Sequence, residues 1–411
     1  MTARHVVVSG LGAITPLGGD VASTWAALLA GKSGIRDEAE GLLAAVGLPV
    51  TIAATMAADP AGRMTPSQSR RLDRSQQAAL TAAAEAWADA GSPDADPDRF
   101  AVAIGTGIGG VTTLLRQDDV LESAGARRVS PRTVPMLMPN ASAALISIEY
   151  GARAGAYTPV SACSSGAEAL AHGARLIRSG DADIVIAGGT EAAITPITVA
   201  GFAQATALSR YRGDPASASR PFAADRDGFV LGEGASVVVL ESAEHAAARG
   251  ARVHAVLAGA GIAADAHHIT APAPDGGGQV AAMRKALAQA GASPADVGHV
   301  NAHATGTPVG DTAEAKAIRG IFGNGIPVTA PKASLGHLFG AAGAVEALIA
   351  ILSVEHDVIP PTRNLADATI DPDIGLDIVT TAREASQRAA ISNSFGFGGQ
   401  NVSLLFTKPT R

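Results

Sequence analysis

The chain has one cysteine, and its surroundings suit either a nucleophile or a small buried side chain. Cys163 follows an apolar run at residues 157–162 and precedes a stretch in which Leu170, Ala174 and Ile177 recur with helical period. We therefore expect the thiol at a helix N-terminus, where free N–H groups and the helix dipole favour thiolate and lower the pKa toward neutrality. A single cysteine excludes an internal disulfide. Position alone leaves the reactive thiol and the buried filler equally open.

Two histidines occupy turns that could bring them to such a thiol. His303 comes directly after a predicted strand at residues 297–301, and open α/β sheets build their sites at strand ends. His337 lies in a glycine-punctuated turn, with Lys332 before it and Glu346 after it. Taken singly, a histidine at a strand end is more often structural. A lysine and a glutamate this close could also form a surface pair worth under about 1 kcal/mol.

A glycine-rich stretch at residues 393–401 lies between two apolar runs near the C-terminus. Glycines there could free backbone N–H groups for an oxyanion. A tight hairpin explains the same spacing without any chemistry, and spacing alone favours the hairpin.

The elements that must position these residues read as βαβ units. Apolar, β-branched runs alternate with Ala-rich stretches of helical period, which predicts an α/β fold with a mainly parallel sheet. A charged, Ala-rich helix ending at Gly250 separates an N-terminal half, residues 1–250, from a C-terminal half, residues 251–411. In each half a strand leads to a polar turn and then to a helix, at Cys163 and at His337, so we expect a weak internal duplication that brings both turns into one site. The predicted strands are residues 6–9, 100–105, 159–162, 184–187, 237–240, 253–257, 297–301, 326–329, 376–379, 391–395 and 402–406.

The bulk composition limits the classes of function. The chain has 411 residues, of which 47% are hydrophobic, so it can build two core units. Its net charge of -7 gives no general attraction to nucleic acid or to an anionic membrane, and no apolar run approaches the roughly 18 residues of a membrane-spanning helix. The N-terminus lacks a secretory pattern, so we expect a cytoplasmic protein. A basic stretch with Arg70, Arg71 and Arg74 is either a solvated helix start or a docking surface for an acidic protein.

These features together resemble the elongating β-ketoacyl-acyl carrier protein synthases of the thiolase superfamily. The resemblance runs across essentially the whole chain, with four separate motifs in the family's order. It implies a thiolase-like fold of two similar halves in five αβαβα layers, working as a dimer. The matching positions are Cys163 with its small neighbours, His303 in residues 301–307, Lys332 with Gly336 and His337, and the loop at residues 395–401.

The resemblance also implies a role for each residue. Cys163 would accept an acyl group from the phosphopantetheine of acyl carrier protein, and malonyl-acyl carrier protein would then lose carbon dioxide and attack it, as in fatty acid elongation. His303 and His337 would donate to the enolate. No bound cofactor and no metal are expected. The other expected site residues are Lys332 and Glu346 as an orienting pair, the N–H groups of Cys163 and Phe397 as the oxyanion hole, Thr305 and Thr307 at the pantetheine arm, and Ile108, Phe202 and Phe397 in the acyl pocket and gate.

Other classes of protein and of site fit fewer of these residues. Residues 105–110 fit Gly-x-Gly-x-x-Gly after a strand, but no second strand ending in an acidic residue follows about 20 positions on, which disfavours a dinucleotide fold. His267 and His268 lack the ligand spacing of a metal site. A chain-length factor usually lacks the active cysteine, and a degradative thiolase needs a second one. The catalytic ketosynthase subunit of a type II polyketide synthase stays open, and with it the choice between a homodimer and a heterodimer with a chain-length-factor subunit.

Overall fold

The computed structural model describes residues 4–43, 47–366 and 369–409, and an eleven-stranded sheet runs through its centre. The strands are β1 (Val6–Ile14), β4 (Phe100–Gly105), β5 (Gly155–Tyr157), β6 (Ile184–Glu191), β8 (Gly234–Ser242), β9 (Ala255–Ala264), β10 (Val297–Asn301), β11 (Pro327–Thr329), β13 (Asp377–Ile378), β15 (Ala389–Gly396) and β16 (Gln400–Thr407). Their order is β13-β11-β10-β15-β16-β9-β1-β8-β6-β4-β5.

The sheet is mixed, so the prediction of a mainly parallel sheet is wrong. Among the described residues, five neighbouring pairs are parallel and five are antiparallel. The antiparallel pairs gather where the two halves meet, at β6, β8, β1, β9, β16 and β15. There β15 and β16 are joined by a tight hairpin, which needs no crossover helix.

Ten of the eleven predicted strands are found. Residues 100–105 and 297–301 have the predicted bounds, and eight others overlap a strand. The strand predicted at residues 159–162 is wrong, because the edge strand β5 ends at Tyr157 and Ala162 already begins a 3₁₀ helix. Ala162 has φ +51°, a conformation that is rare for a residue with a Cβ and that turns the chain sharply before Cys163.

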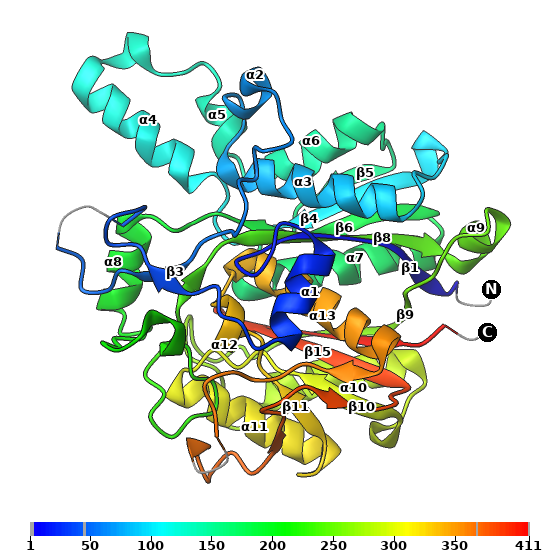
Figure 1. Ribbon diagram of the computed structural model, residues 1–411. Helices are drawn as coiled ribbons and strands as arrows, with labels where there is room; N and C mark the ends of the chain where they lie inside the picture. The colour runs from blue at the N-terminus through cyan, green and yellow to red at the C-terminus, as the bar shows by residue number, and fades with distance from the viewer. Residues whose placement is uncertain (1–3, 44–46, 367–368, 410–411) are drawn as a thin grey trace.

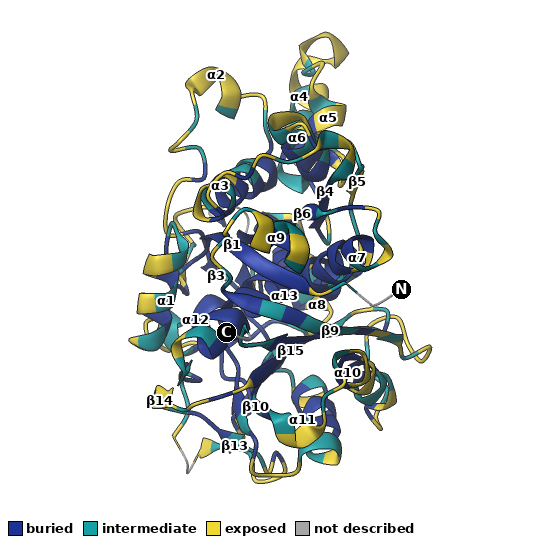
Figure 2. Cartoon of the chain, turned by 90° about the vertical axis from the view of Figure 1, so that its right-hand side faces the viewer, coloured by how far each residue is buried: buried dark blue, intermediate teal, exposed yellow. Residues whose placement is uncertain are grey.

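Helices and the two parts of the sheet form five layers (Figures 1 and 2). In Figure 2 the layers follow one another from top to bottom, and the αβαβα arrangement is confirmed. The outer helices are α3 (Arg74–Asp89) and α6 (Ala141–Tyr150) on the N-terminal part, the middle ones α7 (Ser165–Ser179) and α13 (Ala342–His356), and the outer ones on the C-terminal part α10 (Gly277–Ala290) and α11 (Pro308–Phe322).

The middle layer has sheet on both sides, and its helix α13 has no polar face. Residues 342–354 of α13 are all buried, and Leu170 of α7 and Leu348 of α13 belong to the same core cluster as Leu240 and Phe406 of the sheet. The helical segment Phe339–His356 is long and apolar enough to cross a membrane by length and composition. However, 89% of it is buried inside the protein, which makes it a core helix.

The two halves repeat one topology, as the weak internal duplication predicted. The orders β5-β4-β6-β8-β1 and β11-β10-β15-β16-β9 both have two parallel and then two antiparallel pairs. In one half β5 leads to the 3₁₀ helix η3 (Ala162–Ser164) and α7. In the other, β11 leads through α12 (Lys332–Leu335) to η6 (Phe339–Ala341) and α13. Both 3₁₀ helices begin at a residue with positive φ, Ala162 at +51° and Phe339 at +46°.

The Gly-x-Gly-x-x-Gly run serves packing in this fold. A Cβ on Gly105 would lie 2.2 Å from the carbonyl oxygen of Ser165, and one on Gly107 would lie 2.8 Å from Glu191 Oε2. These glycines let the loop after β4 approach the nucleophile turn, which accounts for the motif without a dinucleotide.

The remaining elements surround this frame. One small sheet contains β2 (Arg36–Asp37), β3 (Ile52–Ala54) and β7 (Leu231–Gly232). Another contains β12 (Val358–Ile359) and β14 (Arg383–Glu384). The other α-helices are α1 (Val21–Leu29), α2 (Pro66–Ser69), α4 (Val111–Ala124), α5 (Thr133–Leu137), α8 (Pro196–Gln204) and α9 (Ala243–Ala248).

Candidate active site

The nucleophile lies where the chain passes from the edge strand β5 to the central helix α7. Cys163 is the middle residue of η3 and is 6% exposed. Ser164 Oγ lies 2.9 Å from the carbonyl oxygen of Ser394 and 2.7 Å from that of Gln400, which fastens this turn to the hairpin between β15 and β16. The backbone N–H groups of Phe397 and of Cys163 itself act to lower the pKa of the thiol, which places both donors beside the sulfur. Two N–H donors beside the sulfur are the arrangement of an oxyanion hole.

The thiol is less acidic than its position in the sequence suggests. Burial raises the pKa of Cys163 to about 11, although the N–H of Phe397 and the charge of Lys332 act in the opposite direction. The prediction that the helix N-terminus lowers this pKa toward neutrality is therefore wrong, because taking the thiolate out of water outweighs its stabilisation. At neutral pH the thiol is protonated and must lose its proton as it attacks.

Alkylation of Cys163 by iodoacetamide is expected to accelerate about tenfold per pH unit from pH 7 to 9.5, because the reactive thiolate fraction grows in this way below a pKa of about 11. Intact mass spectrometry at a series of pH values measures the rate, and the single cysteine makes each cysteine adduct specific. A plateau near pH 7 to 8 would show that the helix N-terminus dominates after all.

His303 is a neutral imidazole with its proton on Nε2. Lys332 Nζ lies 3.2 Å from His303 Nδ1 and 2.6 Å from the carbonyl oxygen of His303. An ammonium group can only donate, so Nδ1 accepts and the ring proton is on Nε2. Burial, followed by the charges of Lys332 and His337, lowers the pKa of His303 well below its usual value.

His337 reaches the same protonation state through a different hydrogen bond. Its Nδ1 accepts the backbone N–H of Phe339 at 3.3 Å, so the ring proton is again on Nε2. Burial and then the charge of Lys332 lower the pKa of His337 well below its usual value. The rings of His303 and His337 have centroids 5.4 Å apart and are nearly perpendicular, at 83°.

The sulfur of Cys163 and one ring nitrogen of each histidine all lie within 4.8 Å of one another. Two neutral N–H donors beside a thiol can stabilise negative charge that develops on a substrate oxygen. Sulfur and imidazole nitrogen are also ligands that Zn²⁺ accepts, and the expectation that no metal is used stays a prediction.

Lys332 and Glu346 form a buried ion pair, with both side chains 2% exposed. Burial raises the pKa of Glu346 to about 7, and the charge of Lys332 acts against this rise. The surface pair considered from the sequence is excluded by this burial. Because Lys332 also donates to the backbone and ring of His303, it orients that histidine and is not free to attack a substrate.

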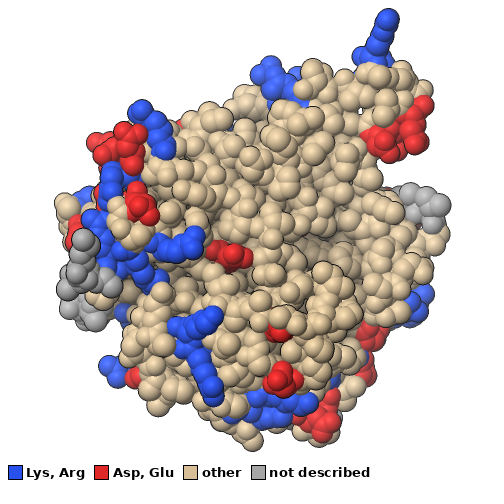
Figure 3. Space-filling view, turned by 180° about the vertical axis from the view of Figure 1, so that it is seen from behind, with Lys and Arg blue, Asp and Glu red and all other residues tan. Residues whose placement is uncertain are grey.

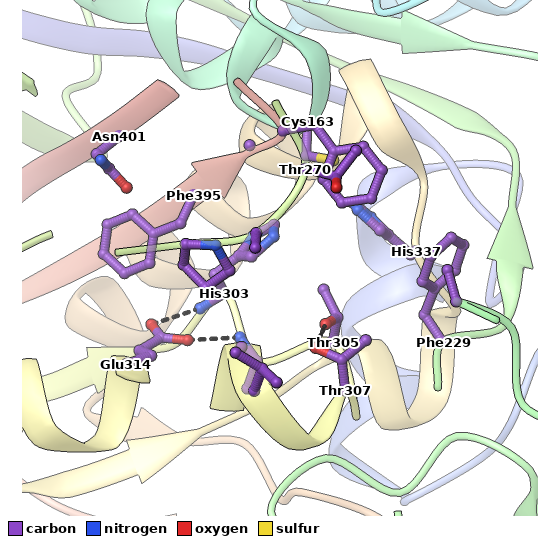
Figure 4. A pocket seen from close by; sticks show the side chains of 18 of the residues that line it. Cys163, Phe229, Thr270, His303, Thr305, Thr307, Glu314, His337, Phe395 and Asn401 are labelled. Atoms are coloured by element: carbon purple, nitrogen blue, oxygen red, sulfur yellow. Dashed lines mark hydrogen bonds between the residues drawn. The ribbon is translucent and has the colours of Figure 1, made fainter. Parts of the chain in front are cut away.

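Two buried acids behind His303 were missed in the sequence. Glu314 of α11 accepts the backbone N–H groups of His303 at 2.8 Å and Ala304 at 2.7 Å (Figure 4), and Asp311 accepts that of Gly306 at 3.1 Å. Burial raises the pKa of Glu314 to about 7 and that of Asp311 to about 6. Their only signal is an i, i+3 spacing of acids at a helix start, which is equally ordinary for an exposed helix.

A cavity of about 470 Å³ contains the trio of Cys163, His303 and His337. Thr305 and Thr307 line it as well, and their hydroxyl oxygens are 3.0 Å apart. Phe397, Phe395 and Asn401 from the hairpin between β15 and β16 complete one side. Residues 393–401 therefore form the predicted tight hairpin and also line the cavity.

Two residues expected in the acyl pocket do not line this cavity. Ile108 is 38% exposed. The ring centroid of Phe202 lies 5.0 Å from that of Phe339 and 6.4 Å from that of Phe397, and these two rings do line the cavity. Phe202 thus lies behind the cavity wall, because the rings of Phe339 and Phe397 stand in front of it.

The basic stretch around α2 divides into two environments. Arg70 and Arg71 follow α2 and are exposed. Arg74 directs its guanidinium to the buried Glu233, with Nε 2.9 Å from Oε2 and Nη2 2.5 Å from Oε1. Arg74 is therefore half-buried in an ion pair and has less charge available for docking than Arg70 and Arg71.

Comparison with known proteins gives consistent matches over the chain. Residues 3–246 match the family "Beta-ketoacyl synthase, N-terminal domain", and residues 254–366 match "Beta-ketoacyl synthase, C-terminal domain". The 3-oxoacyl-(acyl-carrier-protein) synthase 2 of Mycobacterium bovis is 44% identical over 405 residues, which are 98% of this chain and 97% of that protein.

Two solved structures cover 100% of both chains with TM-scores of 0.90. One is a type II polyketide synthase acyl-carrier protein in complex with its ketosynthase bound to the hexaketide, at 30% identity. The other is the ishigamide ketosynthase/chain length factor, at 33% identity.

The five-layered fold and the trio of Cys163, His303 and His337 define an acyl-transferring condensing enzyme of the thiolase type. The family matches extend over both halves and the identity is 44% along almost the whole chain. The chain belongs to the β-ketoacyl synthase family.

Proposed function

We propose that this enzyme carries out the decarboxylative condensation of an acyl group on Cys163 with malonyl-acyl carrier protein, in cytoplasmic fatty acid elongation. The observation that carries the proposal is the placement of two neutral imidazole N–H donors beside a buried thiol. Such donors suit an enolate oxygen, which simple acyl hydrolysis does not form. The name of the 44% identical relative supports the fatty acid pathway. We further propose that the halves 1–250 and 251–411 contribute the nucleophile and the histidines respectively.

The first half-reaction transfers the acyl group to the enzyme. The sulfur of Cys163 attacks the acyl thioester of the carrier, and the thiol proton ends on the departing pantetheine sulfur. The backbone N–H groups of Cys163 and Phe397 stabilise the tetrahedral oxyanion. The product is acyl-Cys163 and a free carrier.

The second half-reaction forms the carbon–carbon bond. The malonyl thioester loses carbon dioxide, and the electron pair of the broken bond becomes an enolate whose oxygen accepts from Nε2 of His303 and of His337. The enolate carbon attacks the acyl carbonyl carbon, Cys163 leaves as thiolate, and the thiolate then takes up a proton from water. Neutral imidazoles at this place keep their protons available as hydrogen-bond donors throughout.

Both substrates would arrive on the phosphopantetheine arm of acyl carrier protein, so no bound cofactor is needed. The hydroxyls of Thr305 and Thr307 line the same cavity as Cys163 and can hold the polar arm. The exposed Arg70 and Arg71 provide positive charge for an acidic carrier on a chain whose net charge is -7. Phe397 would act as the gate of the cavity. Ile108 and Phe202 would contact the acyl chain where it extends beyond this cavity.

Reversing both arginine charges, in Arg70→Glu/Arg71→Glu, is expected to raise the KM for malonyl-acyl carrier protein about tenfold with little change in kcat, because electrostatic steering acts on the encounter. A matched control is Arg284→Glu/Arg388→Glu, which changes the net charge equally with exposed arginines elsewhere. Equal KM values for the two double variants would refute docking at this stretch.

A subunit partner is proposed from the unpaired edge of the sheet. Within the described part of the chain, strand β5 pairs with β4 alone, and exposed apolar side chains surround it: Tyr157 on β5, Val160 after it and Ile148 on α6, which are 36%, 57% and 78% exposed. Figure 3 shows a broad face of the molecule with few charged side chains. A second copy would cover such an edge, giving a homodimer.

The catalytic ketosynthase subunit of a type II polyketide synthase is the second candidate. The fold similarity to the ishigamide ketosynthase/chain length factor favours it, with a chain-length-factor subunit on the same edge. The deciding experiment incubates the purified chain, alone and with a candidate partner subunit, with a panel of acyl carriers and malonyl-acyl carrier protein. β-Ketoacyl carrier made by the chain alone supports the homodimeric elongation enzyme. Product formed only with the partner subunit supports the second candidate. Absence of product in both incubations would contradict both candidate functions.

A further inference from the structure

A buried carboxylate near the nucleophile has no part in the reaction as described so far. Glu191 is the last residue of β6 and is fully buried. Three of the four groups that it contacts are backbone N–H groups, which can only donate, and the fourth, the Thr106 hydroxyl, accepts the N–H of Gly109 and so donates its own proton to Glu191. Both oxygens of Glu191 therefore accept, and these hydrogen bonds act against the burial that raises the pKa of Glu191. Oε1 accepts from Thr106 Oγ1 at 3.0 Å and the N–H of Ile108 at 3.3 Å, and Oε2 accepts from the N–H groups of Gly107 at 2.6 Å and Gly340 at 3.1 Å.

These donors come from two segments that are far apart in the chain. The loop at residues 106–108 follows β4, whereas Gly340 lies in η6, next to the residue whose N–H fixes the tautomer of His337. A Cβ on Gly340 would lie 2.3 Å from the backbone nitrogen of Gly107, so the segments are in close contact. The carboxylate of Glu191 therefore sets how the turn of His337 lies against the N-terminal half.

The two halves of the fold can be compared at Glu191, because the elements around it have counterparts around Cys163. Cys163 is the second residue of η3 and Gly340 the second residue of η6, and the strands β6 and β15 have eight residues each. The residue directly after β15, Phe397, supplies its N–H beside Cys163. At the equivalent place in the other half, the end of β6 supplies the carboxylate of Glu191, which accepts the N–H of Gly340.

We propose that Glu191 is a positioning residue. Its carboxylate accepts the N–H of Gly340, the residue that corresponds to Cys163 in the other half, and thereby fixes His337 for decarboxylation. The inference rests on the condensation proposed above. Glu191 also acts on the nucleophile through its charge, because burial chiefly raises the pKa of Cys163 and Glu191 adds to that rise while Lys332 opposes it. The other titratable groups that face the thiol, His303 and His337, are neutral.

The test compares Glu191→Gln with Glu191→Asp in both half-reactions. Glu191→Gln keeps the size but removes the charge and turns an NH₂ group toward N–H groups. It is expected to lower the ratio of malonyl-carrier decarboxylation to Cys163 acylation about tenfold, since a displaced His337 loses alignment. It is also expected to shift the pH profile of Cys163 alkylation to lower pH, because a nearby negative charge is gone. Glu191→Asp keeps the charge, so its alkylation profile should match the wild type and its ratio should recover in part.

The outcomes separate this inference from the proposed function. A wild-type enzyme without malonyl-carrier decarboxylation overturns the proposed function itself. With an active wild type, the positioning role is overturned if Glu191→Gln keeps the wild-type ratio, or if it loses both half-reactions equally with an unshifted alkylation profile. Should Glu191→Gln fail to fold, Thr106→Val removes one donor and leaves the charge. It should lower the ratio several-fold with an unshifted profile, and a wild-type ratio there would overturn the role.

Discussion

Replacing Cys163 with alanine is expected to lower condensation by at least about 10³-fold, because the variant has no atom that can carry the acyl group between the two half-reactions. Decarboxylation of malonyl-acyl carrier protein should persist, since His303 and His337 remain. Product formation and carbon dioxide release are measured separately by mass spectrometry and a coupled assay. The melting temperature should stay within a few degrees of the wild type, because the residue is small and the turn is fastened by Ser164.

Arg175→Ala is the matched control for Cys163→Ala. Arg175 lies on the same helix, α7, but is exposed and does not line the cavity. It should retain wild-type condensation. Substantial condensation by Cys163→Ala would contradict the acyl-enzyme route and would leave direct transfer between carriers as the alternative.

His337→Ala is expected to lower malonyl-carrier decarboxylation by about 10²- to 10³-fold, the usual cost of removing one donor to a developing oxyanion. Acylation of Cys163 should change far less, because the N–H groups of Cys163 and Phe397 serve that step. The acyl-enzyme is followed by intact mass, and decarboxylation by loss of the malonyl carrier. His5→Ala removes an exposed histidine outside the cavity and should alter neither step. Equal loss of both steps in His337→Ala would assign His337 a structural role.

Much of the site could be predicted because its residues mark the ends of strands and helices. Cys163, His303 and His337 each stand at a turn beside a glycine or another small residue, and such punctuation is visible in the sequence. The buried pair of Lys332 and Glu346 could not be told from a surface pair, because the surrounding layers that bury it come from distant parts of the chain. Glu314 and Glu191 were missed for the same reason, since each binds backbone N–H groups that no side-chain pattern reveals.

The errors in the fold and electrostatics have a common physical origin in burial and long-range pairing. The predicted strand before Cys163 was apolar enough, but at the edge of the sheet its pairing ends at Tyr157 and Ala162 turns with positive φ. The thiol pKa was expected to fall from a local helix effect, whereas burial by the surrounding layers raises it to about 11. The ion pair of Arg74 could not be predicted either, because its partner Glu233 lies 159 residues away in the sequence.

The most direct test of the account follows the mass of the enzyme through both half-reactions in one experiment. Acyl-acyl carrier protein alone should add one acyl group, located by peptide mapping on Cys163. Addition of malonyl-acyl carrier protein should then return the enzyme to its unmodified mass while β-ketoacyl carrier appears in equal amount. An adduct on any other residue, or an acyl-Cys163 that persists while β-ketoacyl carrier accumulates, would contradict the central claim that Cys163 carries the acyl group between the two steps.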